Sequence, residues 1–155
     1  MIGGLIKRAR KANGGLIGIR NNLNIMKSVT ICSSNRFADE AEKFAKKLEK
    51  LGVNVLIPHF YTKNYGGVDN VEGHNKKFIA MGLTHDHFYK IRKSDVVFMF
   101  NKEGYSGNST TLELGYAVAL GKPIYALSNK DIETCRDILF QGYAKTPEEL
   151  IKFLK

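Results

Sequence analysis

The segment spanning residues 104–117 combines the residue types and spacing best suited to chemistry. Its sequence, GYSGNSTTLELGYA, runs from a loop with two glycines into an expected helix. Glycine lets the backbone approach a ligand closely, and hydroxyl side chains at a helix start stand where backbone amides point outward. Glu113, in the expected first turn of the helix, is a candidate catalytic carboxylate. The candidate substrate-binding residues of this segment are Gly104, Gly107, Ser109 and Thr110.

Glu113 also has a purely structural interpretation. Thr110 and Glu113 have the spacing of a capping box, in which the two side chains satisfy backbone amides at a helix start. An acidic residue there also suits the helix dipole. The residues alone leave both interpretations open.

A second polar segment, Ser33-Ser34-Asn35-Arg36, follows an expected strand. Small hydroxyl groups and an arginine before a helix favour a phosphate or carboxylate, so Ser33, Ser34 and Arg36 are candidate binding residues. The segment matches neither the phosphate-binding pattern GxxxxGK[ST] nor the dinucleotide pattern GxGxxG. Serine and asparagine are also common helix caps, and from this segment alone capping is the stronger interpretation.

A third polar segment covers residues 58–76 and is expected to be a long loop. His59 follows a strand and is a candidate contact to the base or sugar of a ligand. Long loops in compact domains are often functional, so Tyr61, Tyr65 and His74 are candidates for a lid, with an ordinary surface loop as the alternative.

Short apolar segments alternate with helical patterns from residue 28 onward. Strands are expected over residues 28–32, 53–57, 96–100 and 124–127, and helices over about 38–51, 77–93 and 110–120 and from Thr146. This alternation predicts an α/β fold, with an open, mostly parallel sheet of about five strands and helices on both faces. Ligands bind such sheets at the carboxyl ends of the strands, where the three polar segments begin.

Length and composition exclude several classes of protein. A chain of 155 residues has room for one domain, and 43% hydrophobic and 25% charged residues are typical of globular proteins. No run of 18 apolar residues is present, so no membrane-spanning helix is expected. Cys32 and Cys135 match no metal-binding spacing and are too few for a disulfide scaffold, so a cytoplasmic location is expected.

The positive charge is concentrated at the amino terminus. Residues 1–26 carry five basic and no acidic residues, more than half of the net charge of +9. We expect these residues to form a basic, flexible extension, and residues 27–155 to form the domain. A nucleic-acid-binding arm is the alternative for the extension.

Three strings in the sequence resemble the nucleoside 2-deoxyribosyltransferase superfamily, which includes the deoxynucleoside 5′-monophosphate N-glycosidases. They are Gly104-Tyr105 through Gly107, then Glu113-Leu114-Gly115-Tyr116-Ala117, then Ala119-Leu120-Gly121-Lys122-Pro123-Ile124. The resemblance covers roughly residues 28–127 and weakens after Ser128. It implies a single Rossmann-like (flavodoxin-like) domain, no cofactor and a homo-oligomer of two or more chains, and it adds Tyr105 to the candidate substrate-binding residues.

The resemblance also implies a mechanism. In that family a helix-borne glutamate, matched here by Glu113, attacks the anomeric carbon and expels the base. The covalent glycosyl-enzyme intermediate is then resolved by water or by a second base. We expect Glu113 to be ionised at pH 7, as ordinary carboxylates are. Ser33, Arg36 and Ser109 are expected to hold the sugar-phosphate end.

The position where the family usually has an aspartate that assists the base is His87 here, with Asp86 beside it. A histidine can donate a proton near neutral pH but cannot accept a hydrogen bond from a sugar hydroxyl as a carboxylate does, so Asp86 is the second candidate. Alternatively, His85-Asp86-His87 only opens a helix. No metal site is expected there, because residues two apart do not face one side of a helix.

The leading hypothesis is cleavage or transfer at the N-glycosidic bond of nucleosides or their 5′-monophosphates, with a small molecule as the partner. Hydrolysis and transfer stay open, since both pass through the same intermediate. The alternatives are a non-catalytic nucleotide-binding or sensing module and a lysine-decarboxylase-like nucleotide phosphoribohydrolase. The latter ranks lower because its doubled PGG and GT-containing string is missing. Nucleic-acid binding ranks last, because the domain has no recognition-helix motif or aromatic stacking platform.

Overall fold

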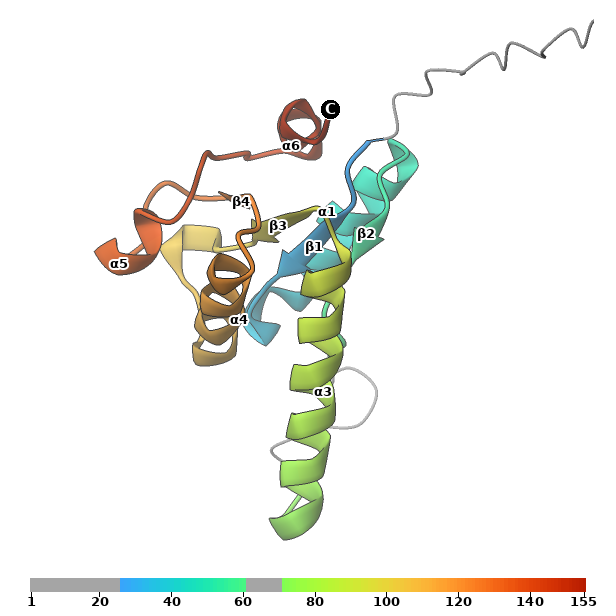
Figure 1. Ribbon diagram of the computed structural model, residues 1–155, viewed down its shortest axis with the longest axis vertical. Helices are drawn as coiled ribbons and strands as arrows, with labels where there is room; N and C mark the ends of the chain where they lie inside the picture. The colour runs from blue at the N-terminus through green and yellow to red at the C-terminus, as the bar shows by residue number, and fades with distance from the viewer. Residues whose placement is uncertain (1–25, 61–70) are drawn as a thin grey trace, which may run out of the picture.

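A parallel β-sheet forms the centre of the computed structural model, which describes residues 26–60 and 71–155 (Figure 1). Within these residues the sheet has four strands in the order β2-β1-β3-β4. The strands are β1 (Val29–Cys32), β2 (Val55–Leu56), β3 (Val96–Met99) and β4 (Ile124–Ala126). Every neighbouring pair is parallel. The α/β fold and its open parallel sheet are therefore confirmed, with strands shorter than the sequence indicates.

The two central strands, β1 and β3, are fully buried, because helices cover both faces of the sheet. Side chains of successive strand residues point to opposite faces, and the core accordingly divides in two. Ile31 and Phe98 pack against the helices on one face. Cys32 and Val97 belong to the cluster on the other face.

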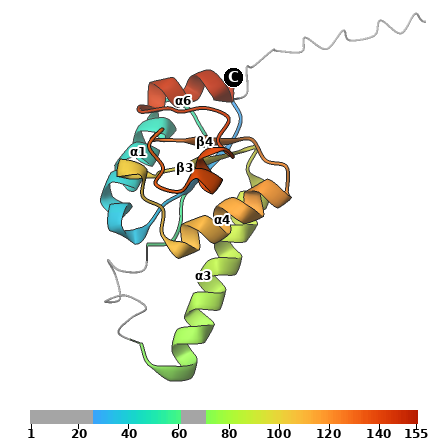
Figure 2. The same cartoon turned by 90° about the vertical axis from the view of Figure 1, so that its left-hand side faces the viewer.

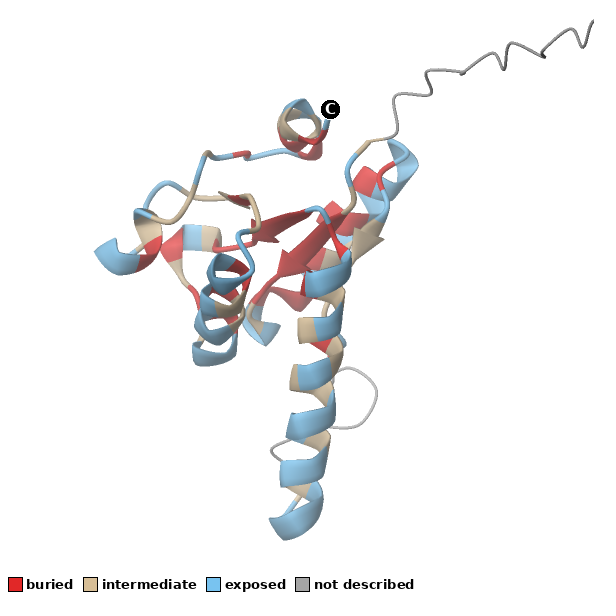
Figure 3. Ribbon diagram, viewed as in Figure 1, coloured by how far each residue is buried: buried red, intermediate tan, exposed pale blue. Residues whose placement is uncertain are grey.

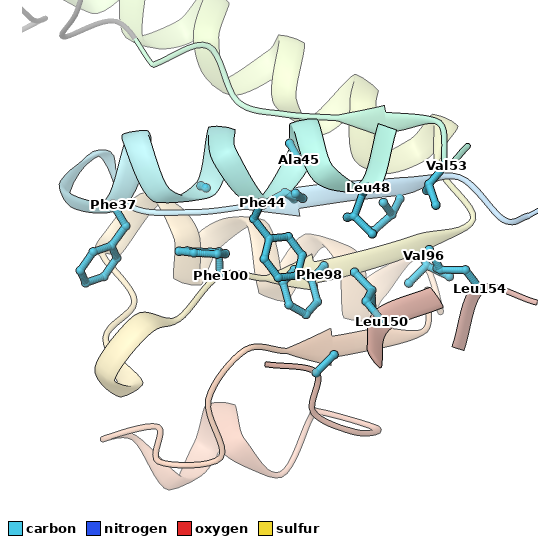
Figure 4. Close-up of a cluster of buried hydrophobic side chains, with 14 of the residues drawn as sticks. Phe37, Phe44, Ala45, Leu48, Val53, Val96, Phe98, Phe100, Leu150 and Leu154 are labelled. Carbon is cyan, nitrogen blue, oxygen red and sulfur yellow. The ribbon is translucent and has the colours of Figure 1, made fainter. Parts of the chain in front are cut away.

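On the first face lie α1 (Ala38–Lys50) and α6 (Pro147–Leu154). Figure 4 shows their apolar side chains meeting those of the sheet, with Phe44 stacked on Phe98 at a ring distance of 5.0 Å. Helix α6 begins as the sequence predicts: Thr146 accepts a hydrogen bond from the amide of Glu149 and is the N-cap.

On the second face lie α3 (Gly73–Lys93) and α4 (Asn108–Ala119), which contact each other (Figure 2). Ile91 of α3 and Leu114 of α4 reach the core. Three short helices complete the described elements: η1 (Asn35–Phe37), η3 (Lys102–Gly104) and α5 (Thr134–Asp137).

Helix α3 begins at Gly73, four residues before the expected start. The suggestion that residues 85–87 open a helix and the placing of His74 in a loop are therefore both wrong. His85, Asp86 and His87 lie inside the helix and do not open it. His74 belongs to the first turn of the helix and not to a loop. The amino-terminal half of α3 projects away from the sheet and is mostly exposed (Figures 1 and 3).

The basic segment 1–25 and the lid candidates Tyr61 and Tyr65 lie outside the described residues. In the part of the chain that is described, every helix is too short or too polar to cross a membrane.

Candidate active site

A cavity of about 390 Å³ opens between the carboxyl ends of β1 and β2 and the helices α3 and α4. Hydroxyl, imidazole and carboxyl groups line it together with a few apolar side chains. The lining residues are Ser33, Ser34, Asn35, Pro58, His59, Ala80, Leu83, Thr84, His87, Gly107, Asn108, Ser109, Thr110 and Glu113.

Glu113 lies in the second turn of α4, because the helix begins at Asn108 with Gly107 as its N-cap. Thr110 is a buried residue inside the helix and does not cap it. The capping-box interpretation of Thr110 and Glu113 is therefore wrong. The Glu113 side chain is 13% exposed and lines the cavity.

Three polar side chains from three elements meet at Glu113. The Sγ atom of Cys32, at the end of β1, lies 3.4 Å from Nε2 of His87 on α3. The same Nε2 atom lies 3.5 Å from Oε2 of Glu113 on α4. His87 is 3% exposed and Cys32 is completely buried. The fold thus gathers a thiol, an imidazole and a carboxyl group beside the cavity.

Burial changes the protonation of this cluster. Removal from water raises the pKa of Glu113 to about 8, although a hydrogen bond with Cys32 acts in the opposite direction. Burial, with the positive charge of Lys90, lowers the pKa of His87 to about 4, although Asp86 acts in the opposite direction. At pH 7 the carboxyl group is mostly protonated and the imidazole is neutral. This corrects the expectations of an ionised Glu113 and of a histidine that titrates near neutral pH.

Burial also favours the uncharged form of Cys32. Its pKa is raised first by burial and then by the negative charge of ionised Glu113, so it is a thiol at neutral pH. Two buried atoms of the cluster, Nδ1 of His87 and Oε2 of Glu113, have no hydrogen-bond partner within the described residues. Buried polar atoms without hydrogen-bond partners are uncommon in folded proteins. Their presence here is typical of a place where a ligand binds.

Asp86 points away from the cluster. Its carboxylate lies 2.6 Å from Nζ of Lys90 and 3.5 Å from Nε2 of His59, and 37% of its side chain is exposed. His59 lines the cavity, whereas Asp86 does not. The structure therefore places Asp86 next to His59 and outside the cavity lining.

The hydroxyl groups expected to bind substrate do surround the cavity. Ser33 and Ser34 come from the turn after β1, and Ser109 and Thr110 come from the start of α4. The two segments are close, since a Cβ atom on Gly107 would lie 3.6 Å from Oγ of Ser34. Unpaired amides at the start of α4 make this end suitable for an anion.

Ser34 also has the capping role that the sequence indicates. Its Oγ accepts a hydrogen bond from the amide of Arg36 at the start of η1. One hydroxyl can cap this short helix and still line the cavity, so capping and binding are compatible.

Three of the expected binding residues lie outside the cavity lining. The guanidinium carbon of Arg36 stacks 3.9 Å above the centre of the Tyr105 ring, which in turn meets the edge of Phe37. Gly104 has a φ of 76°, and a Cβ atom there would lie 1.7 Å from the carbonyl oxygen of Lys130. Gly104 therefore allows two loops to pack closely.

Sequence reasoning missed Cys32 as a site residue. The available signal was its position as the last residue of an expected strand, directly before Ser33. The cavity wall formed by Ala80, Leu83 and Thr84 was missed too, because nothing in the sequence shows which face of α3 turns toward the sheet.

Comparison with known proteins shows the family of the chain. The model of the family described as nucleoside 2-deoxyribosyltransferase matches residues 31–145, well over half of the chain. The chain belongs to this family. The match includes Cys32, His87 and Glu113, and it extends past Ser128, where the sequence resemblance weakens.

A solved structure shows the same fold. The 2-deoxyribosyltransferase of the psychrotolerant bacterium Bacillus psychrosaccharolyticus superposes with a TM-score of 0.52 at 16% identity, covering 80% of this chain and 90% of that one. A conserved protein from Enterococcus faecalis V583 has a TM-score of 0.46 at 17% identity, with 83% and 88% covered. No curated protein sequence matches this chain.

Proposed function

We propose that this member of the nucleoside 2-deoxyribosyltransferase family cleaves or transfers the N-glycosidic bond of deoxynucleosides, nucleosides or their 5′-monophosphates. The observation that carries the proposal is the buried Glu113 carboxyl group, which lines the cavity 3.5 Å from a buried histidine. The cavity volume of about 390 Å³ is in the range of small-molecule sites.

Glu113 acts as the nucleophile in the proposed reaction. A carboxylate oxygen bonds to the anomeric carbon of the sugar as the carbon–nitrogen bond to the base breaks. Water, or a second base, then attacks the same carbon and releases the glutamate, and the proton lost by the attacking molecule returns to the Glu113–His87 pair. Attack by water gives hydrolysis, and attack by a second base gives base exchange.

His87 supplies the proton that the leaving base needs. At neutral pH the Glu113–His87 pair holds one proton, mainly on the carboxyl group, because burial raises one pKa to about 8 and lowers the other to about 4. As the base departs, the pair passes this proton through His87 to a ring nitrogen of the base. The same transfer leaves Glu113 ionised for its attack.

The other end of the substrate is proposed to lie against the start of α4. Ser33, Ser34 and Ser109 offer hydroxyl groups there, and the amides of the first turn suit a 5′-phosphate. His59, exposed at the rim, is proposed to contact the base or sugar. Arg36 is proposed to join this end when its guanidinium leaves the Tyr105 ring.

A homo-oligomer is part of the proposal, with a second copy of this chain as the partner. Phe78 and Met81, on the projecting half of α3, are 54% and 50% exposed, and Leu112 on α4 is 56% exposed. Burial of these exposed apolar side chains against a second copy would favour association. A cytoplasmic location is also proposed, since Cys32 and Cys135 are free thiols.

One observation favours a second candidate function, nucleotide binding without turnover. The raised pKa of Glu113 leaves little ionised nucleophile at pH 7. A protonated carboxyl group can donate a hydrogen bond to a bound base and leave its glycosidic bond intact.

The deciding experiment is chromatographic detection of free base. The purified chain is incubated with deoxynucleosides, ribonucleosides and their 5′-monophosphates, beside a Glu113→Gln variant. We expect release by the parent and only background release by the variant. Glu49→Gln is the matched control, because Glu49 is exposed on α1, on the other face of the sheet, and should release base as the parent does.

Adding a second free base separates transfer from hydrolysis. Formation of a new nucleoside means transfer, and free sugar alone means hydrolysis. If the folded parent releases no base from any of these compounds but is stabilised by one of them against heat, the non-catalytic function replaces the catalytic one.

A further inference from the structure

The cluster of Cys32, His87 and Glu113 has the geometry of a metal site. One donor atom from each residue lies within 4.8 Å of the other two. Sulfur and nitrogen are 3.4 Å apart, and nitrogen and oxygen are 3.5 Å apart. A tetrahedral zinc ion bonds sulfur at about 2.3 Å and nitrogen or oxygen at about 2.0 Å, which puts neighbouring ligand atoms roughly 3.3–3.6 Å apart. The sulfur–nitrogen and nitrogen–oxygen separations both fall in that range.

The donor set selects among metals. Thiolate and imidazole favour zinc and similar borderline-soft ions, whereas magnesium and calcium prefer oxygen ligands alone. Three protein ligands leave the fourth tetrahedral position open, as in catalytic and inhibitory zinc sites. His87 and Glu113 line the cavity, so the fourth ligand can be a water molecule or a substrate atom that enters from it.

The surroundings add a second, independent reason. Cys32 is completely buried and His87 is 3% exposed, so both donors are already removed from water. The Oε2 atom of Glu113 is buried without a hydrogen-bond partner in the described part of the chain. A cation between the three groups would give this oxygen the partner that it lacks.

We propose that Cys32, His87 and Glu113 bind one Zn²⁺ ion. On binding, the Cys32 thiol releases its proton to solvent, and a protonated Glu113 carboxyl group does the same. Zinc then bonds to sulfur, nitrogen and oxygen, and no atom changes its oxidation state. Binding goes beyond the proposed function and does not depend on it. A consequence that does rest on the proposed function is inhibition, because zinc occupies the carboxylate that would attack the sugar.

The binding test uses the full-length chain without a histidine tag. Zinc chloride is titrated calorimetrically into metal-free protein, and a stoichiometry of one ion per chain is expected. Cobalt(II) replaces zinc in a parallel titration, in which a thiolate-to-cobalt absorption band reports directly on a sulfur ligand. The cobalt spectrum of the parent needs no variant and therefore does not depend on whether a variant folds.

Two pairs of matched variants locate the site. Cys32→Ser and His87→Gln are expected to weaken zinc binding by more than about tenfold, since each removes one of only three protein ligands. Cys135→Ser and His85→Gln change the same residue types at exposed positions and should bind zinc as the parent does. Circular dichroism of the metal-free proteins shows that each variant is folded.

The outcomes separate this proposal from the proposed function. The metal site is overturned if the parent binds no zinc, if cobalt gives no thiolate band, or if folded Cys32→Ser and His87→Gln bind as the parent does. Zinc binding with no base release by the metal-free parent supports the metal site and contradicts the glycosidic activity. Base release without zinc binding supports the glycosidic activity and contradicts the metal site. Base release that zinc suppresses in the parent supports both.

Discussion

At the scale of single residues, the decisive feature is the opposite effect of burial on the pKa values of Glu113 and His87. Burial sets the pKa of the carboxyl group at about 8 and that of the imidazole at about 4, so one proton stays on the pair between these values. If the singly protonated pair is the reactive form, kcat/KM should be constant across the middle of this range. It should fall above about pH 8, where the proton is lost, and below about pH 4, where a second one is gained.

The variant His87→Gln sharpens this prediction. Without the imidazole, Glu113 loses its proton only to solvent, so the remaining activity should increase with pH up to about 8. Over the same range the kcat/KM of the parent should be constant. The measurement is kcat/KM for base release between pH 5 and pH 9 for both proteins. A parent activity that also increases through pH 8 would show that ionised Glu113 acts alone and that His87 passes it no proton.

At the scale of elements, periodicity in the sequence was sufficient to predict the fold but not the contacts of the site. The apolar stretch around Val97 indicated a buried parallel strand, and Thr146 marked a helix start, because both signals depend only on neighbouring residues. The position of Glu113 beside Cys32 and His87 depends on how two helices pack across one face of the sheet. Their pKa values depend on that burial, which no local pattern encodes.

The loop between β3 and α4 gives a prediction at this scale. Gly104→Ala puts a methyl group 1.7 Å from a backbone carbonyl at a φ of 76°, so the two packed loops must separate. We expect a loss of about 2–4 kcal/mol in the free energy of unfolding. Gly82→Ala is the control, because nothing lies within 4 Å of its Cβ position in the middle of α3. It should stabilise the protein by about 0.5–1 kcal/mol.

Urea unfolding of the parent and the two glycine variants provides the measurement. Equal stability of Gly104→Ala and the parent would mean that the loop has room for a side chain. Gly104 would then be free to contact substrate, as the sequence suggests, and its role would not be limited to packing.

At the scale of the whole molecule, the projecting half of α3 is the least explained part of the structure (Figure 1). A helix in a folded protein gains most of its stability from packing, yet Phe78 and Met81 in this half are exposed. A second copy packed on α3 would bury both side chains. The same helix supplies Ala80, Leu83 and Thr84 to the cavity wall, so assembly and substrate binding would be coupled.

The double variant Phe78→Ser, Met81→Ser tests this coupling. We expect the parent to sediment as a dimer or larger and the variant as a monomer, with base release reduced because α3 is less well held. Ile132→Ser is the control: Ile132 is 68% exposed and lies away from α3, in the loop before α5, so this variant should sediment as the parent does. A monomeric parent, or a double variant that still assembles, would mean that α3 is held in place without a second copy.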